Sequence, residues 1–208
     1  MGNILQLPTN PPARLDFQRV RQKRKKKDPE RHGQMNLFGP SSGQSARIVN
    51  LPKRMSPFEE ALTLDERGDQ KASESYWQAI SAGDCVADAY CNLGILESRV
   101  GRTEKAFDCF TKSLCASPRH LESHYNLANL YFEIGNLRLA REHYELATQI
   151  DPSFPNIYFN LGLVLALNED YQAAIEALTT YQDLVSDEEA SQVEELLTSL
   201  KYSLTVHR

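Results

Sequence analysis

Three asparagines recur at a constant spacing of 34 residues, at positions Asn92, Asn126 and Asn160. Each is followed by a leucine and then by a glycine or an alanine, so a whole tripeptide recurs. A carboxamide offers a donor and an acceptor, so each side chain can pair with both polar groups of a peptide backbone. The chemistry that this ladder favours is recognition by hydrogen bonds, and it suits an extended peptide whose side chains vary.

The residues around the asparagines indicate which elements must position them. From about residue 57 the apolar residues follow a helical period, with two such stretches in each 34-residue unit. Gly101 and Gly135 suit the turn between two helices because glycine takes a positive φ at low cost, whereas the third unit has Glu169 there. Small residues that let paired helices approach closely stand at 94, 106, 128, 140, 162 and 174. A period of 34 predicts stacked helix pairs, which bind proteins more often than they catalyse reactions.

This pattern of small residue, turn glycine, alanine, aromatic and terminal proline resembles the tetratricopeptide repeat family. In the unit 87–120 the residues that carry the resemblance are Leu93, Gly94, Gly101, Ala106, Phe110 and Pro118. The resemblance implies an all-α, right-handed superhelix of four helix pairs over residues 57–186, the first of them degenerate. After it, Ser186 to Glu189 reads as a capping box, and an apolar stripe predicts one capping helix within 187–208. The members of that stripe are Val193, Leu196, Leu197, Leu200 and Leu204.

The resemblance also implies that the first helix of each pair lines a concave groove, and that a protein or peptide is the partner. The groove-facing residues that it implies form three rows: Cys91, Tyr125 and Phe159; Asn92, Asn126 and Asn160; Ile95, Asn129 and Leu163. The alternative is that the asparagines bond within the stack or only to water. One variant of the family clamps a terminal carboxylate with lysine, asparagine and arginine. These rows lack the lysine and arginine, so chaperone tails are not expected as ligands.

Residues 1–56 differ in composition, with 12 Lys and Arg against 3 Asp and Glu, whereas the rest has 11 against 25. They are rich in Pro, Gly, Ser and Gln, so we expect a disordered basic tail. A basic run in it could bind nucleic acid, serve as a nuclear address, or contact the acidic body; it consists of Arg19, Arg21, Lys23, Arg24, Lys25, Lys26 and Lys27. A further alternative is that this arm covers the protein's own groove until a partner displaces it.

A second tail motif is the segment QMNLF, which contains Gln34, Leu37 and Phe38. It looks like the peptide by which bacterial replication and repair proteins dock on the sliding clamp. In that reading Gln34 bonds at the rim of a pocket while Leu37 and Phe38 fill it. The alternative is a local anchor that packs Leu37 and Phe38 onto the helical stack.

Several function classes find no support in the sequence. His120, His124 and His143 have no metal-site spacing, and the four cysteines form no zinc or redox pair, so we expect no cofactor, metal or enzymatic activity. Neither a signal peptide nor an apolar run of about 18 residues is present, so we expect no membrane contact. The sequence therefore predicts a non-catalytic scaffold or adaptor in the cytoplasm, or in the nucleus of a eukaryote. The alternative is an accessory protein of nucleic acid or a sliding clamp.

Overall fold

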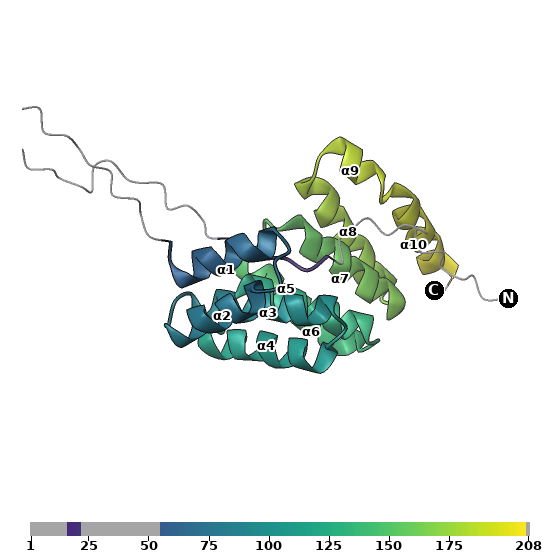
Figure 1. Ribbon diagram of the computed structural model, residues 1–208. Helices are drawn as coiled ribbons and strands as arrows, with labels where there is room; N and C mark the ends of the chain where they lie inside the picture. The colour runs from purple at the N-terminus through teal and green to yellow at the C-terminus, as the bar shows by residue number, and fades with distance from the viewer. Residues whose placement is uncertain (1–15, 22–54, 207–208) are drawn as a thin grey trace, which may run out of the picture.

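The computed structural model of this chain describes residues 16–21 and 55–206. Within these ranges the regular structure is entirely helical, as expected for an all-α protein. The helices pair as α1 with α2, α3 with α4, α5 with α6 and α7 with α8 (Figure 1). Their bounds are α1 Pro57–Glu66, α2 Ala72–Ser81, α3 Val86–Arg99, α4 Thr103–Ala116, α5 Leu121–Glu133, α6 Leu137–Ile150, α7 Pro155–Leu167, α8 Tyr171–Leu184, α9 Asp187–Ser191 and α10 Glu194–Val206.

The pairs stack in chain order into the right-handed superhelix that was expected. Each helix from α1 to α8 packs against the next, and α5 also contacts both α3 and α7. The first helices of successive pairs therefore lie side by side, which brings the repeated asparagines of α3, α5 and α7 onto one surface. No helix of the described ranges combines the length and the apolar character needed to cross a membrane.

The turn and packing residues behave as their spacing predicts. Gly101 and Gly135 have φ values of 74° and 79°, which glycine adopts at low cost. Glu169, which stands at the same place in the third unit, also has a positive φ, of 61°. A Cβ added to Gly94 would lie 2.7 Å from a ring carbon of Phe110, so the close helix approach there requires a residue without a side chain.

The C-terminal cap differs from the single helix that was predicted. Two helices form, α9 and α10, and the chain turns at Gln192 and Val193 between them. The carbonyl of Ala190 accepts from the Val193 N–H at 3.2 Å and from the Gln182 side chain at 3.1 Å, which closes the first helix early. The apolar stripe is nevertheless buried from Val193 to Leu200, and α10 packs on α8.

Residues 16–21 also differ from the expectation of a disordered tail over 1–56. They lie extended against the first helices and are drawn in purple in Figure 1. The composition of the whole tail predicted disorder, but Phe17 and Val20 find apolar partners on the helical stack. We call residues 16–21 the N-terminal segment; residues 1–15 and 22–54 lie outside the described residues.

Candidate functional site

Two of the repeated asparagines, Asn126 and Asn92, hold the backbone of the N-terminal segment. The Gln18 N–H donates to Asn126 Oδ1 at 2.7 Å, and Asn126 Nδ2 donates to the Gln18 carbonyl at 2.9 Å. One repeat earlier, the Val20 N–H donates to Asn92 Oδ1 at 2.8 Å, and Asn92 Nδ2 donates to the Val20 carbonyl at 3.1 Å. Each carboxamide therefore pairs with both polar groups of one residue.

The step of two residues per repeat follows from the geometry of an extended chain. The N–H and C=O of residues i and i+2 point to the same side, whereas those of the residue between them point away. Gln18 and Val20 thus meet successive asparagines, and the segment runs opposite to the order of the repeats. This register depends only on backbone groups.

Apolar side chains of the segment add contact area. Val20 is 7% exposed and belongs to a buried cluster with Cys91 and Ile95 of α3 and with residues of α4 and α5. The ring of Phe17 stacks on Phe110, with 6.1 Å between the centroids. We call the surface formed by Asp65, Cys91, Asn92, Ile95 and Asn126 the segment-binding face.

Arg19 of the segment forms an ion pair with the segment-binding face, and its partner is Asp65 of α1. Arg19 Nη2 lies 2.7 Å from Asp65 Oδ1, and the Asp65 side chain is only 2% exposed. The Tyr76 hydroxyl donates to Asp65 Oδ2 at 3.0 Å, while Arg99 is farther away at 3.9 Å. Burial raises the pKa of Asp65 above its ordinary value, although the charge of Arg19 acts in the opposite direction.

Asp65 was not among the predicted site residues, although the sequence carries a signal for it. Phe58, Ala61 and Asp65 are spaced by three and four residues, which places the aspartate on the buried face of α1. A carboxylate at such a position requires a partner, since an unpaired buried charge is strongly unfavourable.

The asparagines also bond within the helical stack, which is the alternative that the sequence left open. Asn92 Nδ2 donates to the Tyr76 hydroxyl at 3.1 Å, and Asn126 Nδ2 lies 3.3 Å from Cys91 Sγ. Asn160 donates to the Tyr125 hydroxyl at 3.0 Å and to Asn129 Oδ1 at 3.1 Å. All three asparagines are buried.

The remaining predicted groove residues divide among three places. Ile95 lies beside Val20 in the segment-binding face. Tyr125 and Asn129 belong to the hydrogen-bond network around Asn160, in which Tyr144 also donates to Asn129. Phe159 and Leu163 lie in the core around α7 and α8, where the Phe159 ring packs edge-on against Tyr181 at 5.5 Å.

Of the tail residues predicted to bind a partner, only Arg19 and Arg21 lie in the part of the chain that the structure describes. Within the basic run, Arg19 is committed to Asp65 and Arg21 is exposed, whereas Lys23, Arg24, Lys25, Lys26 and Lys27 lie outside the described residues. Gln34, Leu37 and Phe38 of the clamp-like motif also lie outside them.

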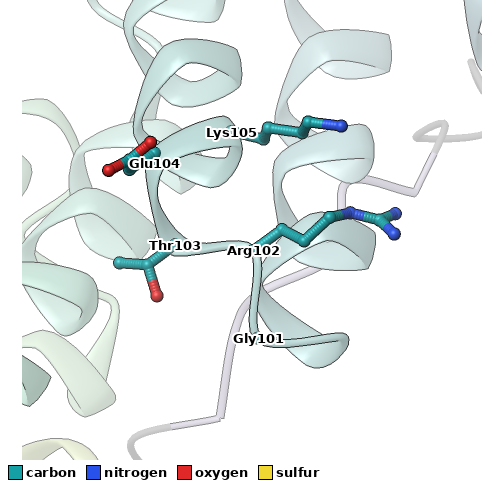
Figure 2. Close-up of a pocket in the computed structure, with 5 residues that line it drawn as sticks. All are labelled: Gly101, Arg102, Thr103, Glu104 and Lys105. Carbon is teal, nitrogen blue, oxygen red and sulfur yellow. The ribbon is translucent and has the colours of Figure 1, made fainter.

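A shallow pocket lies at the turn between α3 and α4. Its lining consists of Gly101, Arg102, Thr103, Glu104 and Lys105, all from one stretch of chain (Figure 2). Arg102 is paired with Glu97, so the most basic group of the pocket is already bound. No histidine, cysteine and carboxylate cluster in the described ranges is arranged to hold a metal ion.

Models of a known repeat family match these helix pairs. The family model described as TPR repeat matches residues 128–169, and the model described as tetratricopeptide repeat matches residues 87–120 and 155–184. Protein NPGR2 of Arabidopsis thaliana is 30% identical over 104 residues, which are 49% of this chain and 14% of that protein. Tetratricopeptide repeat protein 8 of Homo sapiens is 29% identical over 48% of this chain and 19% of its own length. The chain thus spans less than a fifth of either relative.

Solved structures share the fold at low identity. The crystal structure of MamA has a TM-score of 0.59 and 21% identity, covering 69% of this chain and 85% of that one. MamA 41-end from Desulfovibrio magneticus RS-1 has a TM-score of 0.57 and 19% identity, covering 72% and 89%. The first TPR of Spaghetti (RPAP3), solved with the HSP90 peptide SRMEEVD, has a TM-score of 0.52 and 22% identity, covering 57% and 93%.

Proposed function

The chain belongs to the tetratricopeptide repeat superfamily, and from that premise we propose that its segment-binding face receives an extended segment of a partner protein. The observation that carries the proposal is the paired contact of Asn92 and Asn126 with the Val20 and Gln18 backbones. A solved neighbour of the same fold holds a bound peptide, which supports a peptide as the class of ligand.

Backbone recognition makes this face tolerant of side-chain sequence. A hydrogen bond contributes about 1 kcal/mol net, whereas a buried polar group without a partner costs about 1–3 kcal/mol. Asn92 and Asn126 are fully buried with the segment in place, so an occupant that replaces it must supply the same backbone pairing. A partner segment in extended conformation meets this requirement through any residue except proline at the two paired positions.

The protein's own segment competes with such a partner. Residues 16–21 occupy the face within one chain, so their binding carries no loss of translational freedom, unlike the binding of a separate peptide. We therefore propose a scaffold that is covered by its N-terminal segment until a partner of higher intrinsic affinity displaces it.

The charge of the face separates this ligand class from acidic tails. Asp65 is buried where Arg19 enters, so a carboxylate at that place would meet a like charge. The peptide SRMEEVD of the solved neighbour carries several acidic residues. We infer a different specificity here, in agreement with the absence of the carboxylate-clamp lysine and arginine from the groove rows.

The test uses the full chain with its segment released. The double substitution Gln18→Pro, Val20→Pro removes both N–H donors that the asparagines accept, and it leaves the helices unchanged in sequence. A labelled peptide of residues 14–23 is then titrated by fluorescence anisotropy. We expect the released chain to bind the peptide and the wild-type chain to bind it at least about tenfold more weakly, because its face is occupied.

The asparagines are tested in the same released chain. Asn92→Ala with Asn126→Ala should weaken peptide binding by at least about thirtyfold, since four hydrogen bonds are lost. Asn168→Ala, at an exposed asparagine that follows α7, is the matched control and should have no effect. Unchanged affinity in the double alanine variant, or no binding to the released chain, contradicts the proposed function.

A further inference from the structure

We propose that Asp65 makes the segment-binding face selective for a partner segment with a basic side chain between its two backbone-paired residues. This rests on the proposed function and adds the chemistry of the partner. In the internal segment that basic residue is Arg19, which lies between Gln18 and Val20. The partner we infer is an extended peptide with arginine or lysine at this place and an aliphatic residue directly after it.

One oxygen of the Asp65 carboxylate is bound by Tyr76, and the other faces a cation of the segment. Asp65 Oδ2 accepts from Tyr76, whose hydroxyl also accepts from Asn92 Nδ2, so the acid is connected to the first rung of the ladder. Its Oδ1 faces Arg19 Nη2 at 2.7 Å. Among the described residues Arg99 is the other cation nearby, at 3.9 Å and with a half-exposed side chain. The close charge partner is therefore supplied by the occupant.

The register of the occupant fixes where its basic residue must stand. Asn92 and Asn126 hold two residues separated by one, and in an extended chain the side chain of the residue between them points to the opposite face from theirs. On the next residue, Val20 is buried beside Cys91 and Ile95. A peptide that slips by one residue so that its basic residue takes the place of Val20 would put a charged side chain in this apolar cluster, which is strongly unfavourable.

A neutral side chain in place of Arg19 leaves Asp65 buried without its close counter-charge. Truncating one member of a buried charge pair typically weakens binding by about thirtyfold or more. Lysine retains the charge, and only one guanidinium nitrogen, Nη2, contacts the carboxylate, so an ammonium group can replace that single contact. The selection is therefore for positive charge at one position, and not for the forked geometry of arginine.

Peptide variants test this without altering the fold of the protein. The peptide of residues 14–23 is titrated into the full chain carrying Gln18→Pro and Val20→Pro, with substitutions made in the peptide alone. We expect Arg19→Lys to bind within about fivefold of the parent, Arg19→Gln to bind about thirtyfold more weakly, and Arg19→Glu to bind more weakly still. The matched control is Arg21→Gln, which removes the same charge from an exposed position and should change affinity by less than about threefold.

A substitution on the protein tests whether the preference for a basic peptide residue depends on Asp65. Asp65→Asn keeps an acceptor for Tyr76 and removes the charge, so the released chain with Asn at 65 should bind the parent and Arg19→Gln peptides with similar affinity. Equal binding of the parent and Arg19→Gln peptides to the chain with Asp65 overturns this inference and leaves the proposed function intact. Failure of the parent peptide to bind at all contradicts the proposed function instead. If Arg21→Gln weakens binding as much as Arg19→Gln, attraction is due to net charge and Asp65 selects nothing.

Discussion

The carboxamide of Asn126 contacts both backbone groups of Gln18, at 2.7 Å and 2.9 Å, and its orientation is therefore fixed by the segment. An asparagine that donates to and accepts from the backbone of one residue recognises the course of the backbone and not the identity of the side chains. Repetition of this contact at Asn92 gives the face a fixed register of two residues per repeat. Asparagines that are 34 residues apart in the repeats therefore bind residues that are two apart in the segment.

The first prediction concerns the segment in the free protein. If the N-terminal segment occupies the face in solution, the Gln18 and Val20 amides should exchange with solvent far more slowly than amides of an unfolded peptide. Asn126→Asp replaces the donor to the Gln18 carbonyl with an oxygen, so it should release the segment and accelerate exchange at Gln18 by at least about tenfold. Hydrogen exchange followed by NMR measures both amides separately. Rapid exchange at both positions in the wild-type chain would show that the segment does not occupy the face.

Much of the fold could be predicted because its determinants are local and repeated. The residues that permit close helix approach, such as Gly94 opposite Phe110, recur in phase, and the recurrence is visible in one sequence. The break between α9 and α10 was missed; at this break the Gln182 side chain donates to the Ala190 carbonyl. That contact comes from a neighbouring helix and has no signature in the local sequence.

The second prediction follows from the raised pKa of Asp65. The ionised carboxylate binds Arg19, so the affinity of the 14–23 peptide for the released chain should fall as the pH decreases and Asp65 takes up a proton. Arg99, Tyr76 and Glu66 are the other charged or titratable groups that act on Asp65. Burial raises the pKa of Tyr76, so its hydroxyl keeps its proton over this pH interval. Affinity is measured at pH 7.5 and 5.0. The Asp65→Asn chain supplies the control, and an equal loss of affinity in both chains would place the titrating group elsewhere.

The third prediction concerns the turn before α8. Glu169 has a φ of 61°, a conformation that costs a residue with a side chain about 1–2 kcal/mol. Glu169→Gly should relieve this cost and raise the free energy of unfolding by about 0.5–1 kcal/mol, after the greater freedom of glycine in the unfolded chain is subtracted. The midpoint of denaturant unfolding measures the change.

The matched control for that substitution is the reverse change at the equivalent turn. Gly135 has a φ of 79° and open space where a Cβ would stand, so Gly135→Ala should destabilise the fold by about 1 kcal/mol through the backbone alone. Two shifts of the same sign would show that something other than backbone conformation decides stability at these turns.

The candidate site was predictable in its chemistry, and its occupant, the N-terminal arm, was one of the alternatives that the sequence left open. The carboxamides of Asn92 and Asn126 indicated backbone recognition, and that contact is present. The residues of the arm that make the contact were missed, because Phe17 and Val20 stand in a tail whose average composition predicts disorder, and a few apolar residues do not change that average. Asp65 could be found only by asking why a carboxylate stands on the apolar face of α1.

The fourth prediction concerns two adjacent histidines, the buried His124 on α5 and the half-buried His143 on α6. His124 Nε2 lies 3.1 Å from the Pro118 carbonyl and must donate to it, so His124 Nδ1 is an acceptor in the neutral ring. His143 Nδ1 lies 3.0 Å from His124 Nδ1 and therefore donates to it. Burial, with the nearby His124 as a second cause, lowers the pKa of His143 to about 4, and burial also lowers the pKa of His124. Protonation of His124 would bring two N–H donors face to face.

Acid should therefore destabilise the stack through this pair. Both histidines have a pKa of about 6.5 in the unfolded chain and a lower pKa in the folded one, so the unfolded state takes up protons first. The stability that the neutral pair contributes is fully present above about pH 6.5 and is lost as the pH falls towards about 4. Since His143 is partly exposed, we expect its share of the loss to be about 1–2 kcal/mol.

The measurement is the free energy of unfolding in urea at pH 7.5 and 5.0. His143→Gln retains an N–H donor for His124 and cannot titrate, so it should lose less stability over this interval than the wild-type chain. Equal losses in the two chains would mean that the pair does not set the acid sensitivity of the fold.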